Sequence, residues 1–143
     1  MKNKIFIDTN ILIYSIDRFD KTKQKNARAL LKEIAANGTG VISTQVLQEF
    51  FVAATKKLNA APLIVKEIIN SFEKFEVIQV TVEMIKEAID VSLLNKLSFW
   101  EALIVVSAET AKCAALLTED LNAGQMIKSV KIINPFITKA GNL

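Results

Sequence analysis

The segment Lys4-Ile-Phe-Ile-Asp-Thr-Asn-Ile-Leu12 decides the fold class, because a short apolar run ends there at a carboxylate. The run before Asp8 predicts a strand that is covered on both faces of its sheet. Thr9 or Asn10 is then expected to cap a short helix that runs to about residue 16. The segment is therefore a strand–helix unit with an acid at the carboxyl end of its strand.

The rest of the chain repeats this alternation of strand and helix. Together with residues 4–7, the predicted strands are 40–43, 77–80, 114–118 and 130–133. The longer predicted helices are 22–36, 44–58, 62–72, 82–96 and 98–112. This order indicates an α/β fold with a central parallel sheet of about five strands and right-handed crossovers.

The composition fits one domain over residues 1–143, since 51% of the residues are hydrophobic and can fill a core. Four glycines and two prolines are too few for a sandwich or small barrel. The single cysteine, Cys113, excludes an internal disulfide framework and suits a reducing compartment. Asp8 interrupts any signal-like apolar run, and no apolar stretch is long enough to span a bilayer. We expect a soluble cytoplasmic protein without a membrane partner.

The residue types that the chain lacks limit its chemistry further. It contains no histidine and one cysteine, which excludes histidine-dependent nucleases, Ser-His-Asp and Cys-His hydrolases, and zinc sites with histidine or several cysteine ligands. An enzyme of this composition would use carboxylates, lysines, hydroxyls or a bound ion. The net charge of +3 permits an anionic partner such as RNA, but it also describes an ordinary surface.

Four acids stand out because their neighbours in the sequence are strongly apolar. Asp8 ends the first predicted strand and Asp120 follows the fourth, whereas Glu49 and Glu101 lie on helices. If the first and fourth strands are neighbours, the two aspartates open onto one crevice at the carboxyl ends of the strands. Carboxylates that share a crevice need a cation, and their hard oxygens suit magnesium or manganese. Such an ion indicates hydrolysis of phosphate esters by an activated water.

Each of these acids also has a purely structural explanation. Asp8 suits a helix cap, Asp120 suits a loop or cap, and Glu49 suits a solvated helix position. Ser98 and Glu101 match the spacing of a capping box, which on spacing alone is the favoured explanation of that glutamate. The two roles of Glu101 are compatible if one oxygen caps the helix and the other binds an ion.

The segments that carry these acids resemble the PIN-domain family, and especially its VapC-type toxin ribonucleases. They occur in the family's order and span nearly the whole chain: Phe6-Ile-Asp-Thr-Asn-Ile-Leu12, Val46-Leu-Gln-Glu-Phe50, Ser98-Phe-Trp-Glu-Ala-Leu-Ile104, Leu117-Thr-Glu-Asp-Leu-Asn-Ala-Gly124 and Ile133-Asn-Pro-Phe136. No single segment is specific, but the five together at these spacings are. The resemblance implies a three-layer α/β/α sandwich around a parallel sheet.

The resemblance also implies an endoribonuclease that depends on Mg²⁺ or Mn²⁺. The family's acidic positions fall on the four acids already described: Asp8, Glu49, Glu101 and Asp120. Asn10 and Thr118 fall on polar positions that support the metal site. The implied partners are an RNA substrate, a cognate antitoxin whose bound segment blocks the active site, and a second copy of the chain in a homodimer.

One residue departs from the family's pattern, because Glu101 stands where the family usually has an aspartate. The extra methylene displaces the carboxylate by about 1.5 Å, and magnesium tolerates poor geometry badly. The alternative function is therefore a catalytically weak PIN-fold module that binds RNA or a protein. A receiver-like signalling domain fits poorly, because Lys131 lies within the last predicted strand, and no glycine-rich loop supports a nucleotide-binding role.

Basic residues at two places in the chain are candidates for contacts with RNA phosphates. One group lies near the start of the second predicted helix and the other at the end of the third: Lys21, Lys23, Lys25 and Arg28, then Lys56 and Lys57. A run of charges is more often a solvated helix face, so each of these contacts is an open expectation.

Overall fold

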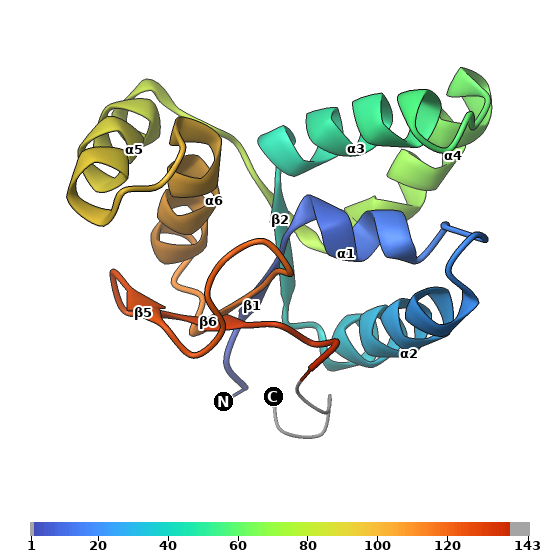
Figure 1. Cartoon of the computed structure of the whole chain (residues 1–143), viewed down its shortest axis with the longest axis horizontal. Helices are drawn as coiled ribbons and strands as arrows, with labels where there is room; N and C mark the ends of the chain where they lie inside the picture. The colour runs from blue at the N-terminus through green and yellow to red at the C-terminus, as the bar shows by residue number, and fades with distance from the viewer. Residues whose placement is uncertain (1, 138–143) are drawn as a thin grey trace.

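The computed structural model describes residues 2–137, which form a central sheet with helices on both sides (Figure 1). The strands are β1 (Ile5–Ile7), β2 (Gly40–Ser43), β3 (Glu76–Ile78), β4 (Ala115–Leu117), β5 (Met126–Ile127) and β6 (Val130–Ile133). The helices are α1 (Thr9–Tyr14), α2 (Lys21–Asn37), α3 (Thr44–Lys56), α4 (Pro62–Ser71), η1 (Phe72–Lys74), α5 (Val82–Asn95) and α6 (Phe99–Thr110). In Figure 1, α1 to α4 lie on one side of β1 and β2, and α5 and α6 lie on the other.

The sheet has the order β3-β2-β1-β4-β6-β5, and its first five members pair in parallel. All five predicted strands are therefore confirmed. The structure adds a sixth strand at one edge, where the two-residue strand β5 pairs antiparallel with β6. Two residues are too short to show a periodic pattern, which explains why the sequence did not predict β5.

The strand register places the candidate site. Ile7 of β1 pairs with Leu117 of β4, and the backbone N–H of Asp8 donates to the carbonyl of Leu117 at 3.0 Å. The residues that follow the two strands, Asp8 and Thr118, are thus neighbours at the carboxyl edge of the sheet. The pairing of the first and fourth strands, on which the predicted crevice depended, is present.

Each helix that matters for the site begins immediately after a strand or a tight turn. The cap of α1 is Asp8, whose Oδ1 accepts from the backbone N–H of Thr9 at 2.7 Å, so the expected cap at Thr9 or Asn10 is wrong. Ser43 caps α3 by accepting from the N–H of Val46 at 3.3 Å. These caps fix the first turns of both helices against the strands that precede them.

The core lies between the sheet and the two helical layers. Its largest fully buried side chains come from strands and from α1 and α3, and include Phe6, Ile42, Leu116, Ile132 and Phe50. Each such side chain contributes roughly 1.5–3 kcal/mol through burial. Residues 102–108 of α6 are all buried, and α5 packs against this helix. The rigid core therefore holds the helix that carries Glu101.

Two further expectations concern the free cysteine and helices that could span a membrane. Burial raises the pKa of the Cys113 thiol to about 12, so this free thiol is neutral and poorly reactive at neutral pH. Within residues 2–137, no helix combines the length and apolar character that a crossing of the bilayer requires.

Candidate active site

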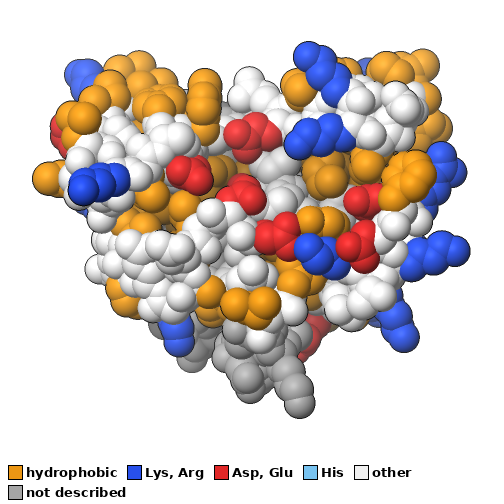
Figure 2. Space-filling view, viewed as in Figure 1, with side chains coloured by type: hydrophobic (Ala, Val, Ile, Leu, Met, Phe, Trp, Pro, Cys, Tyr) orange, Lys and Arg blue, Asp and Glu red, His pale blue; other side chains and the backbone are white. Residues whose placement is uncertain are grey.

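A cleft of about 990 Å³ opens at the carboxyl edge of the sheet, between α1, α3 and the start of α6. All four acids singled out in the sequence line this cleft: Asp8, Glu49, Glu101 and Asp120. Figure 2 shows acidic side chains gathered in the hollow of this face and basic side chains around it. The fold thus brings together carboxylates that are up to 112 residues apart in the chain.

Asp8 is the most buried of these acids, with 8% of its surface exposed. Its Oδ1 accepts from the Thr9 N–H, and its Oδ2 accepts from the Thr118 hydroxyl at 2.8 Å. Burial raises the pKa of Asp8 to about 6, and the nearby charges of Asp120 and Glu49 add to this effect, although the two hydrogen bonds oppose it. The ionised form of Asp8 is therefore destabilised by its surroundings.

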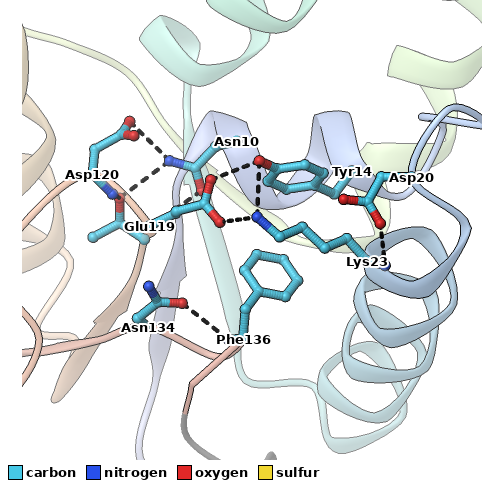
Figure 3. A network of polar contacts seen from close by, with 9 residues as sticks. Asn10, Tyr14, Asp20, Lys23, Glu119, Asp120, Asn134 and Phe136 are labelled. Carbon is cyan, nitrogen blue, oxygen red and sulfur yellow. Dashed lines mark hydrogen bonds and ion pairs between the residues drawn. The ribbon is translucent and has the colours of Figure 1, made fainter.

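Asn10 and Thr118 connect Asp8 to Asp120. The Asn10 amide donates to Asp120 Oδ2 at 2.9 Å and to the Thr118 hydroxyl at 3.2 Å (Figure 3). The Thr118 hydroxyl also accepts from the backbone N–H of Asp120 at 3.1 Å. The two polar residues that were expected to support the site thus contact both aspartates, and they fix how far apart the carboxylates lie.

Glu49 is held by two residues that the sequence analysis missed. Its Oε1 accepts from the Thr9 hydroxyl at 2.7 Å, and its Oε2 accepts from the Gln45 amide at 3.2 Å. Gln45 is buried, also donates to the carbonyl of Trp100 at 3.1 Å, and keeps its own Oε1 without a hydrogen-bond partner among the described residues. The signal for Gln45 was present in the sequence, because it precedes Glu49 by four positions and shares its helix face.

Glu101 forms the capping box that its spacing predicts. The Ser98 hydroxyl accepts from the Glu101 N–H at 3.1 Å, and Glu101 Oε1 accepts from the Ser98 N–H at 3.0 Å. The half-buried side chain nevertheless lines the cleft. Its structural role is therefore established, and a second role is compatible with it through Oε2.

The fit of a metal ion to this cleft rests on the donor chemistry. Within residues 2–137, no three acidic side chains lie close enough together to hold an ion in the arrangement seen. Each of the four acids accepts hydrogen bonds from the protein, and none forms a salt bridge with a described lysine or arginine. Carboxylates without a cationic partner around a cleft are suitable ligands for Mg²⁺ or Mn²⁺.

Comparison with protein-family models decides the family, because the model described as "PIN domain" matches residues 5–127. The chain belongs to the PIN-domain family. The resemblance noted from the sequence is thus confirmed, and so is the α/β fold class. No curated protein sequence matches the chain significantly.

Solved structures that share this fold come from several bacteria, and two of those described next contain toxins. VapC20 from Mycobacterium tuberculosis, a Sarcin-Ricin loop cleaving toxin, has 17% identity and a TM-score of 0.70 over 87% of this chain and 98% of its own. A toxin–antitoxin complex from Klebsiella pneumoniae has 22% identity and a TM-score of 0.64 over 89% and 95%. FitAcB from Neisseria gonorrhoeae has 12% identity and a TM-score of 0.65 over 94% and 99%. At these identities the likeness establishes the shared fold.

The six basic residues proposed for RNA contact divide into three pairs in this PIN domain. Lys56 and Lys57, at the end of α3, line the cleft. On α2, Lys23 binds Glu119 instead, and Arg28 Nε donates to the carbonyl of Ser15 at 2.7 Å. The remaining two are exposed and do not line the cleft: Lys21 and Lys25.

A polar and aromatic cluster that the sequence did not predict lies beside the cleft, and two of its members, Tyr14 and Glu119, line it (Figure 3). Lys23 Nζ donates to Glu119 Oε2 at 2.5 Å and lies 4.5 Å from the ring centroid of Tyr14 and 5.1 Å from that of Phe136. The Tyr14 hydroxyl donates to Glu119 Oε1 at 2.6 Å. Glu119 is thus neutralised by Lys23, whereas its neighbour Asp120 is not, which distinguishes two adjacent acids.

Replacing Glu119 with glutamine should lower the free energy of unfolding by about 1 kcal/mol near neutral pH, because it removes the charge-assisted bonds to Lys23 and Tyr14. Burial alone would raise the pKa of Glu119, but these hydrogen bonds outweigh burial and hold the pKa below its usual value. A lowered pKa stabilises the fold above the ordinary glutamate range, and this stabilisation is lost as the pH falls. Urea denaturation from neutral to strongly acidic pH should show the difference between the two proteins shrink, and a constant difference would contradict this origin.

Proposed function

We propose that this PIN domain is a divalent-metal-dependent endoribonuclease and the toxin of a toxin–antitoxin pair. The observation that supports this most strongly is the group of four carboxylates around one cleft, with no cationic partner among the described residues and with a buried member whose pKa is raised. A fold neighbour with known action, VapC20 from Mycobacterium tuberculosis, cleaves the Sarcin-Ricin loop. RNA is accordingly the substrate class of this proposal.

In this proposal Asp8 and Asp120 hold the cation, and Glu101 contributes directly or through a water. When bound, the ion would polarise a phosphate oxygen and lower the pKa of a coordinated water. Asn10 and Thr118 keep the two aspartates at a fixed separation through the hydrogen bonds described above. Glu49, oriented by Thr9 and Gln45, would either orient the attacking water or hold a second ion.

A second candidate function is a PIN-fold module that binds RNA or protein without useful catalysis. Two observations favour it: Glu101 Oε1 is occupied by the capping box, and no three described acids lie close enough to hold an ion. This candidate predicts RNA binding that neither magnesium nor manganese converts into cleavage.

The partners in this proposal are a cognate antitoxin and a second copy of the chain. Apolar side chains that line the cleft, such as Val52 and Leu58, would receive an antitoxin segment. A stripe of exposed apolar residues along α5 would form the homodimer contact: Val82, Ile85, Ile89 and Leu93. Light scattering of the purified chain, alone and with the product of a small adjacent gene, would test both contacts. A location in the cytoplasm is part of this proposal and agrees with a single buried thiol.

The proposed function predicts cleavage of a mixed RNA pool in the presence of Mn²⁺ or Mg²⁺, and none in EDTA. Because water is the proposed nucleophile, the products should carry a 5′-phosphate and a 3′-hydroxyl. Products with a 2′,3′-cyclic phosphate would mean attack by the ribose hydroxyl and would exclude the scheme. RNA binding without cleavage under either metal would favour the binding module, and either ion should raise the melting temperature if it binds the acids.

A further inference from the structure

Trp100 is the one tryptophan of the chain, and it is exposed at the rim of the cleft. Its exposed fraction is 60%, although residues 102–108 of the same helix, α6, are all buried. Tryptophan is enriched at binding interfaces, because its ring offers a large apolar face and its N–H can form a hydrogen bond. Neither the carboxylates nor the capping box accounts for it, so this residue remains to be explained.

The position of Trp100 is rigid. Its ring packs edge-to-face against that of Phe99, with centroids 5.1 Å apart and an angle of 77° between the planes. Its carbonyl accepts from the buried Gln45 amide, which also binds Glu49. The capping box fixes the first turn of α6 on which Trp100 lies. An exposed aromatic ring on a fixed backbone loses little conformational entropy when a flat ligand stacks on it.

The cleft is charged differently along α3. Gln45, next to Trp100, lies at the start of this helix, Glu49 lies about one turn further on, and Lys56 and Lys57 lie at its end. At 1.5 Å per residue, the distance from Gln45 to Lys56 along the helix is about 16 Å. An RNA strand whose phosphodiester lies at the acids would therefore have lysines beside its phosphates at one end of the cleft. At the other end it would meet the ring of Trp100.

We propose that Trp100 stacks on an unpaired nucleobase beside the phosphodiester at the acidic centre, and that this stacking makes the chain bind unpaired RNA more strongly than paired RNA. This inference rests on the proposed ribonuclease function. Stacking on an aromatic ring accepts any base, and it requires that the base be unstacked from a duplex. Trp100 thus distinguishes unpaired from paired RNA, but it does not distinguish one base from another.

The test uses Trp100 as its own reporter, since no other tryptophan contributes to the fluorescence. Asp8→Asn protein, in which cleavage should be at least about a hundredfold slower, is titrated with a short oligouridylate, with the matching abasic oligomer, and with a fully paired duplex. Stacking predicts quenching by the oligouridylate and much less by the other two. Fluorescence anisotropy of labelled RNA should show roughly five- to hundredfold weaker binding for Trp100→Ala, with Trp100→Phe close to the parent.

Two variants act as controls. Trp100→Leu keeps apolar bulk but no aromatic face, and it should bind as weakly as Trp100→Ala. In the Trp100→Phe background, Met126→Trp moves the reporter to an exposed position on the edge strand β5, outside the cleft, where RNA should not quench it. Circular dichroism melting would verify that every variant is folded.

Failure of the inference and failure of the proposed function give different results. If the wild type cleaves RNA and the anisotropy of every Trp100 variant is unchanged, the stacking proposal is overturned while the ribonuclease stands. If no variant binds or cleaves any RNA, both fall, and the exposed ring would then be assigned to a protein partner. Equal quenching of the Trp100 fluorescence by paired and unpaired RNA would also overturn the stacking proposal.

Discussion

Replacing Asp8 with asparagine is expected to reduce RNA cleavage at least about a hundredfold while leaving the fold as stable as before, or more stable. The activity falls because the variant lacks the central carboxylate of the proposed cation site. The stability does not fall, because the carboxylate is buried and disfavoured when ionised. Asparagine retains an oxygen that can accept from the Thr9 N–H, so the cap of α1 survives.

The pH dependence of this effect has a definite sign. The pKa of Asp8 is raised from 3.8 to about 6 in the folded chain, so ionisation destabilises the fold progressively between these values. The gain in the free energy of unfolding for Asp8→Asn should thus be largest near neutral pH, at up to about 3 kcal/mol. This gain in stability should disappear below pH 3.8, the ordinary pKa of an aspartate. Denaturant melts at several pH values would measure it.

A matched control separates the site from net charge. Asp90→Asn removes one negative charge from the exposed face of α5, outside the cleft, and should change neither cleavage nor the pH profile. Mn²⁺ should raise the melting temperature of the wild type and of this control by similar amounts. It should raise the melting temperature of Asp8→Asn by less. If Asp8→Asn unfolds instead, the carboxylate is needed mainly as a helix cap, and its catalytic role is withdrawn.

Replacing Glu101 with glutamine should separate the two roles of this residue. The amide oxygen of glutamine can still accept from the Ser98 N–H, so stability should stay within about 0.5 kcal/mol of the wild type. The charge that would assist the cation is lost, and cleavage should fall roughly ten- to a hundredfold. The two effects are read from melting curves and from RNA cleavage under manganese.

The aspartate variant at the same position tests the departure from the family's usual residue. Glu101→Asp shortens the side chain, which should weaken the bond to the Ser98 N–H and cost about 1 kcal/mol of stability. If the extra methylene of the native residue weakens the cation site, cleavage by Glu101→Asp should be faster. Unchanged cleavage in both Glu101 variants would assign this residue to the capping box alone.

Local patterns in the sequence were sufficient for the elements and for the identity of the four acids. Short apolar runs predict strands because they are buried on both faces, and the cap at Ser98 follows from side-chain chemistry within one turn. The sequence leaves the role of Asp8 open, since an acid at the end of a strand can either cap the next helix or face a ligand. The missed strand β5 exists because β6 is beside it, which no local pattern in residues 126–127 encodes.

The sequence by itself therefore determined the order of the elements, because that order depends on local periodicity, and the resemblance of five segments indicated the PIN fold and the four acids. The pairing of β1 with β4, on which the convergence of the acids depends, was established by the structure. Only the tertiary structure decided which partner each polar side chain has. In the structure Lys23 pairs with Glu119, and Asn10 donates to Asp120. Gln45 donates both to Glu49 and to the carbonyl of Trp100. Such contacts join residues up to 110 positions apart, and their energies arise only when packing brings the side chains within hydrogen-bond distance.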